Sequence, residues 1–192
     1  MNSFGRELSK ALMKRLPQSN EYGWSRRVEG ALVRSEETAA HSHVVIIIDC
    51  EISETNAAPI LGEIIRFVTS NQYFRKSKYR VFLWEHGGFT LMPPLKVSAR
   101  ELEQHLAKVA DYDTMSGNWE NFAEIYTPHK KAGQTMLITT ADKIATLKNT
   151  PTARAKNLLI LYPADDGKNG KLAVAGIPCV GYKNDTCNVK GE

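Results

Sequence analysis

The clearest hydrophobic pattern in the chain is an uninterrupted β-branched run, Val44 to Ile48, which ends in Asp49. A strand that is apolar on both faces is typical of the middle of a parallel sheet covered by helices on each side. The next segment, residues 57–68, has apolar residues at three- and four-residue intervals, which is the period of an amphipathic helix. This strand and helix predict the first unit of an α/β fold.

The same alternation continues to the end of the chain. Further strands are expected at 79–84, 89–97, 135–139, 157–162 and 172–182. Further helices are expected at 98–110, 119–129 and 142–147, the first opened by a capping box of Ser98 and Glu101. Because Gly87-Gly88 joins two strand-like runs, those runs should form a hairpin. The order predicts an α/β fold with a doubly wound, mostly parallel sheet, one antiparallel edge strand and helices on both faces.

The first 40 residues differ from the rest. Apolar residues from Phe4 to Leu16 have helical spacing up to Pro17, and a short helix is expected within 26–34. The basic residues of this region are Lys10, Lys14, Arg15, Arg26, Arg27 and Arg34. We therefore expect a basic N-terminal helical arm over 1–40, joined to an α/β domain over 41–192. Such an arm would bind nucleic acid weakly, although a solvated helix face has the same pattern of charge.

Length and cysteine content limit the class of protein. At 192 residues and 42% hydrophobic residues, the chain has the size and composition of one globular domain. No apolar run approaches the roughly 20 residues of a membrane helix, and the first 17 residues lack the apolar core of a secretory signal. Cys50, Cys179 and Cys187 lack metal or redox spacing, which indicates reduced thiols. We expect a cytoplasmic protein without membrane contact.

The loop after the central strand concentrates oxygen ligands. Asp49, Glu51 and Ser53 stand at alternate positions just before a helix. Open parallel sheets bind ligands beyond the carboxyl ends of their strands, where the strand order reverses, so the loops after residues 48 and 139 are the expected site. Hard cations such as Mg²⁺, Mn²⁺ or Ca²⁺ prefer such ligands. The alternative is that Asp49 only caps the helix or binds loop amides.

The frame of Asp49, Glu51 and Ser53 resembles the metal-ion-dependent adhesion site of von Willebrand factor A (VWA) domains, whose first loop is Asp-x-Ser-x-Ser. Residues 80–97 look like the second and third strands of that family, 98–109 like the following helix, and 135–142 like its fourth strand, so the resemblance covers roughly 42–183. It implies a VWA/Rossmann-like fold with Mg²⁺ or another hard divalent cation as cofactor. The ligands that it implies are Asp49, Glu51, Ser53, Ser116 and Asp142.

In VWA domains a carboxylate from a partner completes the metal site, so the resemblance implies a non-enzymatic protein–protein interaction module, acting as adaptor or assembly subunit. The residues expected to contact the partner are Glu54, Thr55, Asp113, Trp119 and Lys143, with Trp119 as an exposed anchor. Three positions depart from the family. Glu51 replaces a serine, and Lys143 replaces a glycine, which would put a cation near the site. The later threonine of the family has only loose counterparts here, in Thr114, Ser116, Asn118 or Glu120. A domain whose metal site is inactive and which serves as a scaffold is the third interpretation.

An enzyme is the alternative interpretation. Metal-dependent nucleases of the PIN or NYN kind use carboxylates at strand ends to hold metal ions that activate water, and Asp49, Glu51 and Asp142 could fill that role. The arginines of 26–34 would then hold phosphates. The Gly87-Gly88 hairpin fits the VWA layout and has no obvious place in the nuclease one, which favours the binding module.

Overall fold

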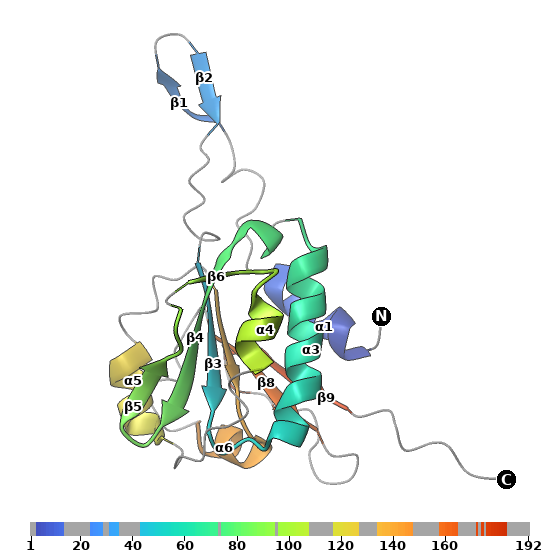
Figure 1. Ribbon diagram of the computed structural model, residues 1–192, viewed down its shortest axis with the longest axis vertical. Coiled ribbons are helices and arrows are strands. Elements are labelled where there is room, and N and C mark those ends of the chain that lie inside the picture. Colours follow the sequence, from blue (N-terminus) through green and yellow to red (C-terminus); the bar gives the residue numbers. More distant parts are fainter. Residues whose placement is uncertain are drawn as a thin grey trace, which may run out of the picture.

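The computed structural model (Figure 1) describes residues 3–13, 24–28, 31–34, 43–72, 74–94, 96–107, 117–126, 134–147, 158–164, 172, 174 and 176–183. Its helices are α1 Ser3–Met13, α3 Glu54–Ser70, η1 Phe74–Lys76, α4 Leu102–Leu106, α5 Trp119–Tyr126 and α6 Ala141–Thr146. Its strands are β1 Trp24–Val28, β2 Ala31–Arg34, β3 His43–Asp49, β4 Lys78–Glu85, β5 Gly88–Leu91, β6 Val97–Ser98, β7 Gln134–Ile138, β8 Leu158–Pro163 and β9 Cys179–Tyr182.

The main sheet has the order β5-β4-β3-β7-β8-β9, and β6 also pairs with β4. Strands β4, β3, β7, β8 and β9 are parallel, whereas β5 and β6 run antiparallel to β4. The apolar run of β3 therefore occupies the middle of a mostly parallel sheet, as its composition predicts. The chain passes from β3 to β4 on one side and later to β7 on the other, so the strand order reverses between β3 and β7.

The sheet divides the apolar core into two layers, because successive side chains of a strand point to opposite faces. Val44, Ile46 and Ile48 of β3 pack with residues of α1, α3 and α4, whereas Val45 and Ile47 pack with residues of α5 and α6. Figure 1 shows α3 and α4 in front of the sheet. Helices on both faces confirm the doubly wound α/β architecture.

The second hairpin strand differs from its prediction. Instead of one strand over 89–97, the chain forms β5 beside the end of β4 and β6 beside its beginning. Pro93 and Pro94 lie between these strands. Proline has no N–H to donate to a sheet ladder, which explains why a single continuous strand does not form.

The N-terminal segment contains one confirmed element and one that was predicted wrongly. Helix α1 buries Phe4, Leu8 and Leu12 in the core layer that contains α3, so this helix docks on the domain. The short helix expected within 26–34 is wrong, because β1 and β2 pair antiparallel in a separate two-stranded sheet (Figure 1). Val28 pairs with Ala31, and only two residues separate them in the sequence, a spacing that favours a hairpin. The division at residue 40 stays a prediction.

Only the Glu101 half of the predicted capping box forms, and the helix begins later than expected, with Glu101 as its N-cap. The backbone N–H and the hydroxyl of Ser98 donate to Oε2 of Glu101 at 2.8 and 2.7 Å. Residues 99–101 form a turn, and the helix proper starts at Leu102. The Ser98–Glu101 pair therefore fixes the entry to α4, one of the two helices beside the candidate site.

Candidate functional site

Asp49 ends β3 at the rim where the strand order reverses, and its side chain is fully buried. Ile48 pairs with Ile138 of the neighbouring parallel strand, which brings Thr139 next to Asp49. The Thr139 hydroxyl donates to Oδ2 of Asp49 at 2.5 Å, and the Glu51 N–H donates to Oδ1 at 3.1 Å. The protein itself therefore supplies a hydrogen-bond donor to each oxygen of this carboxylate.

Lys143 places its ammonium group beside two carboxylates. Its Nζ lies 3.8 Å from Oδ2 of Asp49 and 3.2 Å from Oε2 of Glu51. On another side, Nζ lies 4.5 Å from the centroid of the Trp84 ring, a cation–π distance. The Lys143 side chain is 12% exposed and that of Glu51 is 49% exposed, so the ammonium lies below the surface while Glu51 closes the cluster from outside. The expectation of a cation at this position near Asp49 is confirmed.

Two tryptophans hold the Lys143 segment in place. Nε1 of Trp119 donates to the Lys143 carbonyl at 2.9 Å and to Oγ1 of Thr146 at 3.0 Å. Its ring lies 4.8 Å from that of Trp84 and 5.2 Å from that of Phe122. Trp119 is therefore buried, and its prediction as an exposed anchor is wrong. Trp119 follows a polar stretch of the sequence, which suggested exposure, but its indole packs against α6.

Of the remaining predicted residues, those that the structure describes do not join this cluster. Oγ of Ser53 lies 3.1 Å from Oγ1 of Thr55 at the start of α3, where both side chains and that of Glu54 are exposed. Asp142 is exposed in the first turn of α6. Asp113 and Ser116 lie outside the described residues.

The positions of these side chains determine whether they could hold a divalent metal ion. Mg²⁺ requires near-octahedral oxygen coordination at about 2.0–2.1 Å. Among the described residues, no group of three or more His, Cys, Asp or Glu side chains is placed to share an ion. An ammonium lies next to the two carboxylates that do approach each other, Asp49 and Glu51. The described part of the implied ligand set therefore does not fit a divalent ion.

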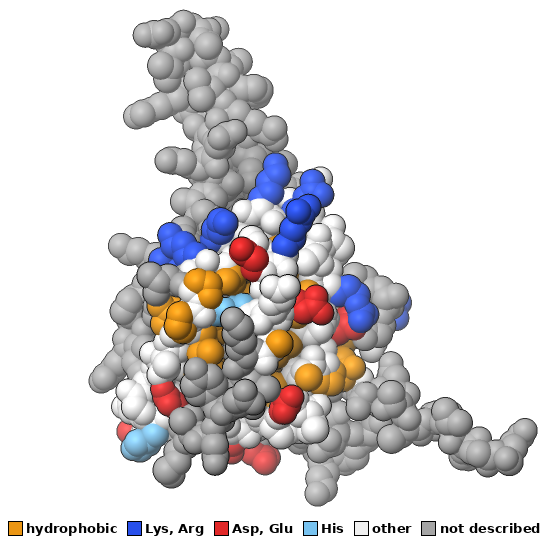
Figure 2. All heavy atoms as spheres, in the orientation of Figure 1, with side chains coloured by type: hydrophobic (Ala, Val, Ile, Leu, Met, Phe, Trp, Pro, Cys, Tyr) orange, Lys and Arg blue, Asp and Glu red, His pale blue; other side chains and the backbone are white. Residues whose placement is uncertain are grey.

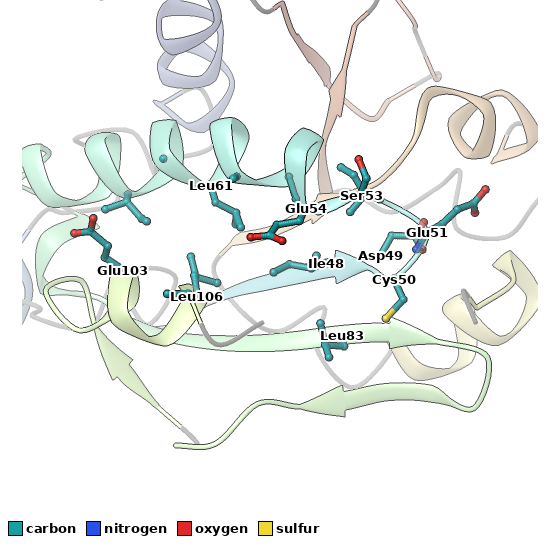
Figure 3. Close-up of a pocket in the computed structure, with 16 residues that line it drawn as sticks. Ile48, Asp49, Cys50, Glu51, Ser53, Glu54, Leu61, Leu83, Glu103 and Leu106 are labelled. Atoms are coloured by element: carbon teal, nitrogen blue, oxygen red, sulfur yellow. The ribbon is translucent and has the colours of Figure 1, made fainter. Parts of the chain in front are cut away.

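A pocket of about 540 Å³ opens beside this cluster (Figure 3). Ile48 of β3 and Leu83 of β4 form its floor, and Leu61 of α3 and Leu106 of α4 face it from the two helices. Acidic side chains also line the pocket, namely Glu51, Glu54 and Glu103. The site thus combines an apolar interior with carboxylates around it.

The pocket was not predicted from the sequence, although α3 contains a signal for it. The buried face of α3 includes Ile60, Ile64 and Phe67, but Leu61 and Ile65 are only half-buried. Both of these residues line the pocket, together with small residues of the same helix. The apolar stripe of α3 therefore extends beyond the residues that pack in the core. An apolar stripe that continues onto the exposed side of a helix is the pattern that would have indicated a surface pocket.

Basic residues gather at the opposite end of the sheet. Figure 2 shows Lys and Arg side chains over the end of the molecule where β6 lies in Figure 1. The exposed basic residues of η1, the start of β4 and the β6 region are Arg75, Lys76, Lys78, Lys96 and Arg100. Lys78 pairs with His43, the first residue of β3, whereas Asp49 is the last. At about 3.3 Å per residue, six steps put these ends about 20 Å apart.

The described thiols agree with the predicted reduced state. Cys50 and Cys179 are both free cysteines, and Cys187 lies outside the described residues. Burial raises the pKa of the Cys179 thiol, which favours its protonated, unreactive form. Cys50 is only partly buried and lines the pocket.

A scan against protein-family models and a search of curated proteins gave no match for this chain. The structure itself defines the class: an α/β protein with a mostly parallel, Rossmann-like sheet and a candidate site at its switch point. Membership of the VWA family stays a prediction. In the described part of the chain, no helix has the length and apolar character that crossing a bilayer requires.

Proposed function

We propose that this protein is a protein–protein interaction module that binds a segment of its partner in the pocket beside Asp49. The observation that supports this function best is the pocket itself, with Ile48, Leu61, Leu83 and Leu106 inside and carboxylates around them. Its volume of about 540 Å³ lies within the range of about 300–1,000 Å³ that is usual for binding pockets. It lies beside the carboxyl end of β3, and open α/β sheets bind their ligands beyond the carboxyl ends of their strands.

The partner segment that fits this chemistry has apolar side chains flanked by lysine or arginine. Apolar anchors would bury the half-exposed parts of Leu61 and Ile65, which supplies affinity. Basic residues beside the anchors would meet Glu54 and Glu103, which supplies orientation and a faster association. The role as adaptor or assembly subunit, the VWA relationship and the cytoplasmic location stay predictions.

The nuclease alternative has less support. The carboxylate of Asp49 already accepts hydrogen bonds from Thr139 and from the Glu51 backbone, and Lys143 lies where a catalytic metal would be needed. The exposed basic residues around Lys78 lie at the other end of the sheet. Phosphates bound there would be about 20 Å from Asp49, which is too far for hydrolysis at that carboxylate.

Peptide selection tests the proposed function. The full chain is immobilised and displayed random peptides are selected on it, after which the affinity of the enriched peptides is measured by fluorescence anisotropy. We expect peptides with apolar anchors next to lysine or arginine. Ala58→Trp should fill the pocket and weaken their binding about tenfold or more, or about 1.4 kcal/mol.

Asn56→Trp provides the matched control. Asn56 is exposed on α3 like Ala58 but does not line the pocket, so its replacement should leave peptide affinity unchanged. Failure to enrich any peptide, or equal binding by the Ala58→Trp variant and the natural chain, would contradict the proposal.

A further inference from the structure

A buried carboxylate at the rim of a sheet needs a compensating positive charge. Asp49 is fully buried, and Glu51 adds a second carboxylate two residues later. An unpaired charge in such a place is strongly unfavourable. Either a bound cation or a basic side chain can supply the compensation, and these two solutions make opposite predictions about metal dependence.

In this protein the ammonium of Lys143 supplies that charge. Nζ lies within hydrogen-bonding distance of Oε2 of Glu51 at 3.2 Å and within ion-pair distance of Oδ2 of Asp49 at 3.8 Å. The group therefore lies between the two carboxylates that would otherwise attract a divalent ion. Its charge would repel such an ion at short range.

The position of Lys143 is built into the fold and does not depend on a flexible surface side chain. Oγ1 of Thr140 accepts the Lys143 N–H at 3.3 Å and caps α6. Trp119 donates to the Lys143 carbonyl, and the Trp84 ring lies beneath the ammonium. These contacts fix both the backbone and the charged end of the residue, unlike an exposed ion pair, in which side-chain freedom offsets the attraction.

We propose that Lys143 is a built-in cation that takes the place of a divalent metal, so that the natural chain is metal-independent and the Asp49–Glu51 loop is a latent cation site. Removal of the ammonium would take the Lys143 charge away from the Asp49 and Glu51 carboxylates, and the Glu51 side chain is half exposed to solvent. A hard divalent cation such as Mn²⁺ would then bind there. The proposal depends on Asp49, Glu51 and Lys143 and does not require the peptide-binding function.

Mn²⁺ binding to the full chain tests this inference. Free Mn²⁺ is measured by electron paramagnetic resonance for the natural protein and for Lys143→Met, which keeps the apolar stem and removes the charge. We expect no Asp49-dependent Mn²⁺ binding by the natural chain. Lys143→Met should bind one Mn²⁺ at millimolar or lower concentration, and a second substitution, Asp49→Asn, should abolish this binding.

Two further variants keep the test decisive. Lys143→Gln serves if Lys143→Met does not fold, and Lys143→Arg, which restores a positive charge, should again bind no Mn²⁺. Mn²⁺ binding by the natural chain that is lost in Asp49→Asn would overturn the inference. The same conclusion would follow if the folded variants without the ammonium failed to bind the ion.

Discussion

At the scale of single residues, the most informative group is the one formed by Asp49, Glu51 and Lys143. The sequence predicts that Asp49 and Glu51 lie at the sheet rim, because these carboxylates directly follow the apolar run of a buried strand. It could not place the ammonium of Lys143 between them. That position depends on the rotation of α6, which is set by the buried contact between Trp119 and the Lys143 carbonyl.

Lys143→Ala should lower the free energy of unfolding by about 1–3 kcal/mol, because it leaves the buried Asp49 without its cation. Urea denaturation in the presence of a chelator measures this change. The double variant Asp49→Asn, Lys143→Ala should lose less stability than the sum of the single variants, because the two residues interact. Strict additivity would mean that the pair is not coupled.

Gly117→Ala should destabilise the protein by about 1–3 kcal/mol, as is usual for overpacking. A Cβ at this position would clash with Nε1 of Trp84 and would lie 2.7 Å from the Glu85 carbonyl oxygen. Gly87→Ala is the control, because a Cβ there has nothing within 4 Å. Thermal unfolding of both variants gives the comparison, and an equal effect would show that Gly117 does not pack against Trp84.

At the scale of elements, periodicity predicted most of the sheet and helices, and its failures have local causes. The central strand and α3 were predictable because each has an unambiguous period. The split of 89–97 follows from Pro93 and Pro94, and the hairpin within 24–34 follows from a short glycine-containing connection. Trp119 was misplaced because a polar loop precedes it, whereas its burial depends on contacts with α6.

The Ser98–Glu101 pair makes the entry to α4 sensitive to pH. The hydrogen bonds from the Ser98 hydroxyl and then from its backbone N–H lower the pKa of the Glu101 carboxyl. A carboxyl with a lowered pKa in the folded state stabilises the protein above its unfolded pKa of about 4.3 and loses this effect as the pH falls through the folded value.

Glu101→Gln should therefore lower the melting temperature at neutral pH, and the difference from the natural chain should shrink below about pH 4. Glu103→Gln removes the same charge from the same region of α4 without the contact to Ser98, so it serves as the control. A difference that stays constant with pH would show that the ionised carboxylate does not stabilise this turn.

At the scale of the whole molecule, the two ends of the sheet have opposite character. The carboxyl end has the acidic, apolar-floored pocket, and the amino end has exposed basic residues in η1, in β4 and on either side of β6. The net charge of +4 does not indicate that acidic and basic residues gather at opposite ends, because the residues of each end come from several distant segments of the sequence. Only the sheet order brings them together.

The N-terminal helix α1 packs against the α/β sheet and its helices, because Leu8 is fully buried in the core layer that also contains residues of α3. Leu8→Ala should lower the free energy of unfolding by about 2–4 kcal/mol. Arg6→Ala, an exposed residue of the same helix, should change it by less than about 0.5 kcal/mol. Equal stabilities in urea denaturation would mean that α1 is not docked on the domain.

The proposed binding pocket is tested most directly by a ¹⁵N NMR titration of the full chain with a selected apolar and basic peptide. We predict that backbone amide shifts concentrate in residues 48–65 and 103–107 and at Leu83, which together include the lining residues of the pocket. Shifts concentrated around residues 75–80 and 96–100, at the basic end of the sheet, would contradict it.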